Sequence, residues 1–248
     1  MTVHSEHRDG VTILTIDRPE RRNALDPPTM RELTAGLRAA AADRTVRCVV
    51  LTGKAPAFCA GLDLAAAAAG ELPDPADNPQ RLLGPEFPVP VVAAVDGPAV
   101  GGGFELALAC ELRVASPRAW FGLPEVTRGL VPTDTGVELT RVLPGAVAFE
   151  VALAGGRLSA ERAYALGLVS QLVADPVAAA GELGQRIAEG APRAMAHCRD
   201  LLHRSPFERG TAWEQEKRDL AAQLLSGPEA AEGTAAFGAR RPPRWGSR

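Results

Sequence analysis

Two glutamates, Glu105 and Glu125, are the side chains of this sequence best placed to perform acid–base chemistry. Glu105 follows three consecutive glycines, which come after an apolar run at 91–95 and a turn signal at 96–98. This order predicts a strand, a turn and the start of a helix. Glycines let a ligand approach the backbone closely, and the first amides of a helix have no intrahelical partner. Glu105 is therefore expected at the mouth of a site that can receive negative charge.

The neighbours of the two glutamates predict different roles for them. A helix N-terminus favours the ionised form of Glu105, which suits a general base. Glu125 follows Pro124 and is flanked by Leu123 and Val126, so partial burial should favour its protonated form, which suits a general acid. The alternative is structural: Glu125 would cap a turn and Glu105 would pair with a surface arginine.

A third segment, residues 57–64, directly follows a predicted strand and supplies backbone rather than side chains. Gly61 permits a sharp turn, after which the amide of Leu62 can point toward the same opening as the amide of Gly102. Two converging N–H donors form an oxyanion hole, which stabilises a developing enolate. Loss of one such donor typically costs about 3 kcal/mol of transition-state stabilisation.

Composition excludes several other functional classes. The chain has 248 residues, is 46% hydrophobic and has a net charge of -3 with no basic stripe, so a nucleic-acid partner is not expected. It has neither an apolar signal-peptide core nor an apolar run of about 18 residues, which predicts a cytoplasmic protein with no membrane partner. The four cysteines lack CxxC spacing and are expected to be structural, and no metal site or dinucleotide motif is expected.

The elements that must position these residues read as an α/β protein. Nearly continuous apolar strands at 11–16, 48–52, 91–95 and 112–115 alternate with helical patterns, which predicts a parallel sheet covered by helices. Asp26 and Pro27 should begin a helix that runs to about residue 42. Further helices are expected at 136–143, 146–153 and 159–166, where Ser159 is the N-cap, and a short strand at 168–173.

Two other stretches bear on function. Residues 65–90 form a long proline-containing connection, either a binding loop or a disordered insertion, of which we favour the binding loop. From residue 176 onward the pattern is helical. We therefore expect an α/β core over residues 1–190, with the active site, and an all-helical region over 191–248 that serves subunit packing.

The motifs carry a resemblance to a known family. Residues 60–64, 99–107 and 121–125, with the Arg-Pro-Glu and Asn-Ala-Leu segments at 18–25, resemble in order and spacing the crotonase (enoyl-CoA hydratase/isomerase) superfamily. Residues 158–169 and 232–242 extend the resemblance over almost the whole chain. It implies a crotonase-like spiral of ββα repeats, a C-terminal helical trimerisation region, a homotrimer or a hexamer made as a dimer of trimers, and acyl-CoA thioester substrates.

The resemblance also implies roles for individual residues. Glu105 and Glu125 would share a water, with Glu105 activating it for attack at the β-carbon and Glu125 supplying a proton to the α-carbon. The amides of Leu62 and Gly102 match the oxyanion hole. Coenzyme A would be part of the substrate, with no separate cofactor. The positions that match the lining of the CoA and acyl passage are Arg22, Ala24, Ala60, Asp63, Leu64, Val100 and Pro124.

Three features depart from the family pattern. Residues 133–137 read Thr-Asp-Thr-Gly-Val where many members have a glycine pair and a threonine, and the segment is one residue shorter. Asp134 is then either a polar group of the pocket or a helix N-cap, and we favour the N-cap. Ala65 stands where some hydratases have a lysine, and the proline-containing connection should shape a distinct acyl pocket.

The leading hypothesis is an enoyl-CoA hydratase, a lyase that adds water syn to a 2-enoyl-CoA to give a 3-hydroxyacyl-CoA. One alternative is a Δ3,Δ2-enoyl-CoA isomerase, in which one carboxylate shuttles a proton and no water adds. The presence of Glu105 favours hydration, because such isomerases commonly lack an acid there. A second alternative is an acyl-CoA-binding protein that keeps the fold without turnover.

Overall fold

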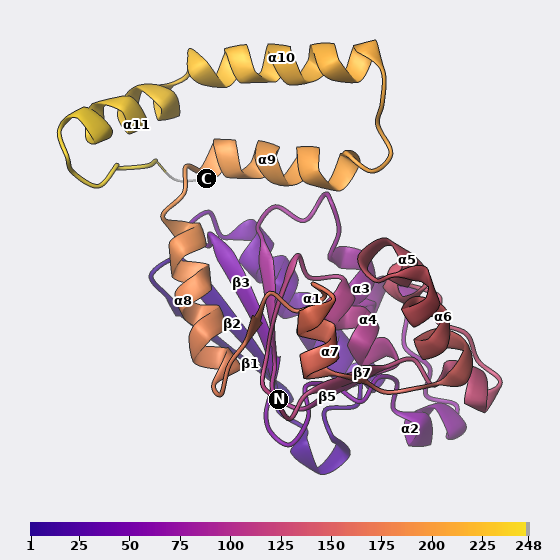
Figure 1. Cartoon of the computed structure of the whole chain (residues 1–248). Coiled ribbons are helices and arrows are strands. Elements are labelled where there is room, and N and C mark those ends of the chain that lie inside the picture. The colour runs from indigo at the N-terminus through magenta and orange to yellow at the C-terminus, as the bar shows by residue number, and fades with distance from the viewer. Residues whose placement is uncertain (247–248) are drawn as a thin grey trace.

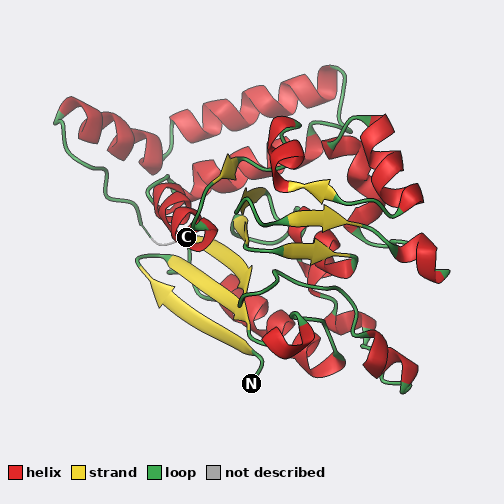
Figure 2. Ribbon diagram, turned by 60° about the horizontal axis from the view of Figure 1, so that its bottom comes forward, coloured by secondary structure: helices red, strands yellow, loops and turns green. Residues whose placement is uncertain are grey.

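The computed structural model describes residues 1–246 as two β-sheets with helices around them (Figures 1 and 2). Within those residues, six strands form the larger sheet in the order β1-β2-β3-β4-β6-β9, in which only the β1–β2 hairpin is antiparallel. Its strands are β1 Val3–Arg8, β2 Val11–Ile16, β3 Cys48–Gly53, β4 Val91–Val95, β6 Leu112–Ala115 and β9 Gln171–Leu172. The smaller sheet contains β5 Pro98–Val100, β7 Trp120–Gly122 and β8 Leu158–Ser159.

The larger sheet is buried on both faces, which explains its apolar strands. In β3, Val49 and Leu51 face the main hydrophobic core, whereas Cys48 and Val50 face a second cluster that includes Ala180 of helix α8, Pro176–Ala188. Burial of successive residues on opposite faces requires a continuous apolar run rather than an alternating one. The strands expected at 11–16, 48–52, 91–95 and 112–115 are all confirmed.

The chain alternates between the two sheets. It leaves β4 for β5 and then enters helix α4, Gly102–Leu108, and it later leaves β6 for β7. Each of these two passages contributes one strand to the larger sheet and one to the smaller sheet. The β4–β5–α4 segment is a ββα repeat of the kind expected. Because β5 and β7 pair in parallel, the segments that follow them, α4 and the 3-10 helix η3, Glu125–Arg128, start at the same edge of the sheet.

The remaining core helices begin mostly where the sequence predicts. Helix α1, Pro27–Ala42, is capped by Asp26, whose carboxylate accepts from the amide of Thr29, and Ser159 caps α7 by accepting from the amide of Arg162. The expected helix at 136–143 is instead a 3-10 turn followed by a short helix. The elements are η1 Pro19–Arg21, α2 Leu64–Ala68, η2 Pro75–Asp77, α3 Pro79–Leu82, η4 Thr135–Glu138, α5 Leu139–Val142, α6 Gly145–Ala154 and α7 Ala160–Ala165.

Three helices follow α8 and lie at one end of the molecule: α9 Pro192–Arg204, α10 Thr211–Leu225 and α11 Pro228–Gly238 (Figure 1). Helix α9 is attached to the core through Arg199, whose guanidinium pairs with Glu111 and donates to the carbonyl oxygens of Gly84, Pro85 and Phe87. No helix among residues 1–246 is both long and apolar enough to cross a membrane.

Candidate active site

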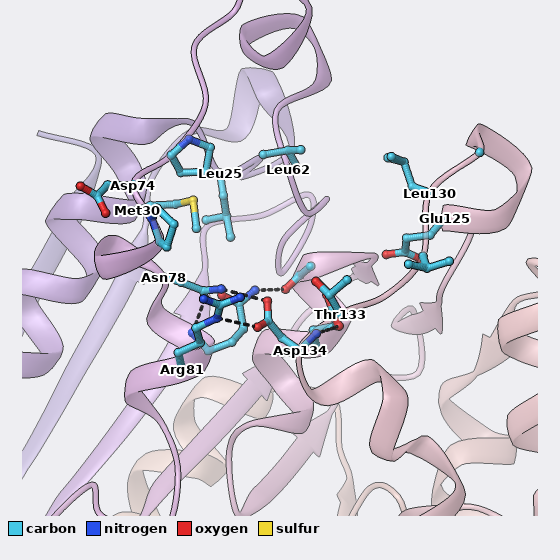
Figure 3. Close-up of a pocket in the computed structure, with 17 residues that line it drawn as sticks. Leu25, Met30, Leu62, Asp74, Asn78, Arg81, Glu125, Leu130, Thr133 and Asp134 are labelled. Atoms are coloured by element: carbon cyan, nitrogen blue, oxygen red, sulfur yellow. Dashed lines mark hydrogen bonds and ion pairs between the residues drawn. The ribbon is translucent and has the colours of Figure 1, made fainter.

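A cavity of about 580 Å³ lies where α4, η3 and the connection between α2 and β4 meet. Glu105 and Glu125 both line it, together with Leu62 and Gly102. Figure 3 labels Leu62 and Glu125 on different parts of its wall. The structure therefore brings together the four residues that the sequence singles out for chemistry. The remaining lining residues are Leu25, Met30, Pro73, Asp74, Pro75, Asn78, Gln80, Arg81, Gly129, Leu130, Val131, Thr133 and Asp134.

Two backbone amides lie side by side at this cavity. Gly61 has a φ of +83°, and a side chain there would place its Cβ 2.7 Å from the carbonyl oxygen of Val100 and 2.9 Å from the amide nitrogen of Gly102. Because the two glycines are so close, the amide of Leu62 lies near Gly102: a Cβ on Gly102 would be 3.8 Å from the amide nitrogen of Leu62. Neither amide has an acceptor within residues 1–246. The pair therefore has the donors that an oxyanion requires.

Glu105 lies in the first turn of α4 and is 6% exposed. Its Oε1 accepts hydrogen bonds from the amides of Asp134 and Gly136, each at 3.0 Å. These two bonds hold the carboxyl group in one orientation. They leave Oε2 without a hydrogen-bond partner in the part of the chain that the structure describes, so this oxygen is available to a ligand.

Glu125 is the first residue of η3, directly after Pro124. Its Oε1 lies close to Gly101, since a Cβ on that residue would come within 2.9 Å of it, and its Oε2 is buried without a partner in the described chain. Gly101 has a φ of +57° and a ψ of -130°, a conformation that side chains disfavour. The glycine run thus lets the backbone approach this carboxyl group while α4 begins.

Burial raises the pKa of both glutamates. For Glu105, the two backbone hydrogen bonds oppose that shift, and the charges of Asp134 and Glu125 add to it. The expectation for Glu125 is confirmed, whereas the expectation that the helix N-terminus favours ionised Glu105 is wrong, because desolvation is the larger effect. The direction of the pKa shift therefore does not by itself distinguish the base from the acid.

The other residues expected to line a substrate passage divide into two groups. Ala60, Leu64, Val100 and Pro124 line a small hollow that also contacts Leu62, Gly102 and Glu125. Arg22 lines a neighbouring hollow with Ala60 and Val100.

Ala24 and Asp63 are buried and line none of these cavities. Burial tends to raise the pKa of Asp63, but hydrogen bonds from the amides of Ala66 and Ala65 and from Arg18 outweigh it and lower that pKa. Its place in this structure is that of the N-cap of α2.

Asp134 differs from the expectation. It precedes η4, but its side chain does not cap that helix. Its carboxylate instead accepts from Asn78 Nδ2 at 2.9 Å and from Arg81 Nε at 3.0 Å, and all three side chains line the cavity (Figure 3). The favoured N-cap reading is therefore wrong, and the alternative of a polar group at the pocket is confirmed. Sequence reasoning missed Asn78 and Arg81, although the proline-containing connection that carries them was expected to be a binding loop.

Comparisons with known proteins agree on one family. The model of the family described as enoyl-CoA hydratase/isomerase matches residues 6–248. Carnitinyl-CoA dehydratase of Salmonella typhi is 34% identical over 259 aligned positions, which cover 100% of this chain and 99% of that protein.

Solved structures give the same result. Enoyl-CoA hydratase from Mycobacterium tuberculosis H37Rv is 36% identical, with a TM-score of 0.90 over 100% of this chain and 99% of that one. Enoyl-CoA hydratase EchA1 from Mycobacterium marinum is also 36% identical, with a TM-score of 0.89 and coverage of 98% of each chain. The expected crotonase-like α/β fold is confirmed.

Proposed function

This chain belongs to the enoyl-CoA hydratase/isomerase family, the crotonase superfamily, and from that premise we propose that it is an enoyl-CoA hydratase. The reaction is the syn addition of water to a 2-enoyl-CoA, which gives a 3-hydroxyacyl-CoA. The observation that carries the proposal is the meeting of two partly buried carboxyl groups and two adjacent unpaired amides at one cavity.

Each group has a distinct task in this reaction. The amides of Leu62 and Gly102 bind the thioester oxygen and stabilise the enolate that forms when water attacks the β-carbon. Glu105 Oε2 takes a proton from that water, because Oε1 is already held by two amides. Glu125 delivers a proton to the α-carbon, and its buried Oε2 favours the protonated form that this step needs.

A second candidate is the reverse direction, the removal of water from a 3-hydroxyacyl-CoA. It is favoured by the 34% identity to carnitinyl-CoA dehydratase along the full chain. The same residues serve both directions, since Glu105 would protonate the leaving hydroxyl group and Glu125 would remove the α-proton. The Δ3,Δ2-enoyl-CoA isomerase remains the third candidate, in which no oxygen from water enters the product.

The deciding experiment is incubation of the protein with a panel of acyl-CoAs in ¹⁸O-labelled water. The panel contains 2-enoyl-, 3-enoyl- and 3-hydroxyacyl-CoAs of increasing chain length, and the products are resolved by mass spectrometry. Uptake of one labelled oxygen by a 2-enoyl-CoA supports hydration. Double-bond migration without label indicates an isomerase, and binding without conversion indicates an acyl-CoA-binding protein.

Substitution of each glutamate tests the assignment of roles. Glu105→Gln and Glu125→Gln should each lower kcat by about 10²- to 10⁴-fold, the usual contribution of a positioned acid or base. Asp74→Asn is the matched control, because Asp74 lines the same cavity yet is exposed at its rim. Undiminished hydration in both glutamine variants would refute the proposed mechanism.

The assembly and the substrate site belong to the same proposal. Residues 191–248 are proposed to mediate a homotrimer or a hexamer, and Arg22, Ala60, Leu64 and Val100 to border the path of coenzyme A. Exposed apolar side chains in this region, among them Leu202, Phe207 and Phe237, are available for subunit contacts. Sedimentation equilibrium of the full chain measures the mass of the assembly.

A further inference from the structure

The segment that departs most from the family pattern, residues 133–137, also holds Glu105 in place. The amides of Asp134 and Gly136 donate to Glu105 Oε1, and the hydroxyl of Thr135 donates to the backbone oxygen of the same glutamate. Three consecutive residues of this short segment thus donate hydrogen bonds to one residue of α4. The orientation of the carboxyl group depends on where the segment lies.

The segment is in turn held by the side chain of Asp134. The carboxylate accepts from Asn78 Nδ2 and from Arg81 Nε, and Asn78 and Arg81 belong to the connection across the cavity. In Figure 3 these three side chains point toward one another, with Glu125 and Leu130 elsewhere around the cavity. We call this group the Arg81–Asp134–Asn78 clasp.

The clasp is part of a continuous set of hydrogen bonds. Asn78 Oδ1 accepts from the amide of Gln80, and Gln80 Nε2 donates to the carbonyl oxygen of Gly102 at 2.8 Å. The clasp therefore connects the segment that holds Glu105 with Gly102, which lines the cavity. Both oxygens of Asp134 are occupied by the clasp, and 16% of its side chain is exposed, so it is fixed on the wall of the site rather than free to take part in chemistry.

We propose that Asp134 is a positioning residue, which through the clasp holds the loop amides that orient Glu105 for catalysis. This inference rests on the proposed function for its kinetic readout and on the clasp geometry for its structural one. Small displacements of a catalytic group lower the turnover rate steeply, even when folding and binding are unaffected.

Kinetics of the clasp variants give the first test. Asp134→Ala and Arg81→Met should each lower kcat about 10- to 100-fold with little change in KM, because the substrate still binds but Glu105 is misplaced. The double variant should fall no further than the more affected single variant, since Asp134→Ala already breaks the contact that Arg81→Met removes. Arg81→Lys, which retains a cation, should recover part of the lost rate.

The pH profile supplies a readout that a purely structural role would not change. The charged groups around Glu105 are Asp134 from the segment before η4, Glu125 from η3 and, beyond Asp134, Arg81 from α3. Asp134→Asn keeps the size of the side chain and removes one negative charge near Glu105. The pKa of Glu105 should then fall, and the acid limb of the activity profile should move to lower pH.

Glu138→Gln is the matched control. It removes an exposed ion pair with Arg141 directly after that segment, and it should leave kcat and the pH profile unchanged. Wild-type kcat and an unshifted profile in the Asp134 variants would overturn the proposal. So would equal rate losses in the control and the clasp variants.

A crystal structure of Asp134→Ala distinguishes failure of this inference from failure of the proposed function. The inference requires that Glu105 Oε1 lose at least one of its two amide donors in that variant, whatever the substrate of the protein proves to be. If Glu105 keeps both donors and its orientation, the clasp does not position it. If no acyl-CoA is converted by the wild type but the displacement occurs, only the proposed reaction fails.

Discussion

Glu105 is a carboxyl group that the fold places where ionisation is disfavoured, although its proposed role as a base requires the ionised form. Its pKa in the folded protein is raised by burial, and the charge of Glu125 adds to that shift. Above the pKa of the unfolded chain, near 4.3 for a glutamate, the folded state is therefore the one that binds the extra proton. Its contribution to stability is then complete at low pH and is lost as pH rises through the folded pKa.

Glu105→Gln should consequently stabilise the protein at neutral pH while it lowers the proposed activity. The glutamine oxygen can still accept from the amides of Asp134 and Gly136, but it carries no charge to desolvate. The gain in melting temperature over wild type should be larger at pH 7 than at pH 4. Calorimetry at the two pH values measures it, and an equal or smaller gain at pH 7 contradicts the assigned pKa direction.

The residue scale is also where sequence reasoning fell short. It identified Glu105, Glu125, Leu62 and Gly102, because motif order and spacing are local properties of the chain. It misjudged the pKa of Glu105, because that pKa is set mainly by burial, and the segment that packs on the carboxyl group lies 29 to 31 residues away in sequence. The contacts of Asp134 with Asn78 and Arg81 span 56 and 53 residues of sequence, and nothing near residue 134 signals them.

At the scale of elements, the turn from β5 into α4 requires a glycine at position 101. Gly101 has a φ of +57° and a ψ of -130°. A methyl group on it would come within 2.9 Å of Glu125 Oε1. Moving the start of α4 would relieve both the backbone strain and the contact. Because α4 begins at Gly102, such a movement would displace the amide of Gly102.

Gly101→Ala should therefore lower the free energy of unfolding by about 1–3 kcal/mol and reduce kcat more than it raises KM. Urea unfolding and steady-state kinetics measure the two effects. Gly70→Ala is the control, because its φ of +84° is also positive and no atom lies within 4 Å of its added Cβ. A kcat loss of equal size in the control would show that backbone strain alone, and not proximity to the site, causes it.

The elements found from sequence are those whose pattern reflects their burial. Strands β3 and β4 are apolar along their whole length since both faces are covered. Strand β1 was not expected, because it is an edge strand and five of its six residues are exposed. Strands β5 and β7 have three residues each, too few to show a hydrophobic period. The strand expected at 168–173 is shorter in the structure, because only Gln171 and Leu172, which form β9, pair with β6.

At the scale of the whole molecule, α9 is joined to the core by a buried charge. Arg199 is 9% exposed and pairs with Glu111, which also accepts from the amide of Val91 and contacts His203. Burial tends to raise the pKa of Glu111, but the hydrogen bond to His203 and the charge of Arg199 outweigh it and hold that pKa below its usual range. The pair is thus satisfied only while α9 is in place.

Arg199→Met should destabilise the protein by about 3–5 kcal/mol, because it removes the cation that pairs with Glu111 and the donor to three carbonyl oxygens. Thermal and denaturant unfolding of the full chain measure the loss. Glu216→Gln, which removes an exposed ion pair between α9 and α10, should have little effect and is the control. A small loss in Arg199→Met would mean that other contacts hold the helix.

The carbonyl oxygens bound by Arg199 belong to residues 84–87, and the connection that ends there also carries Asn78 and Arg81 of the clasp. A helix of the region proposed for assembly is therefore a tether for one wall of the cavity. Residues 1–190 alone would lack that tether. Cutting the chain there would therefore remove a support of the cavity wall together with the region proposed for assembly.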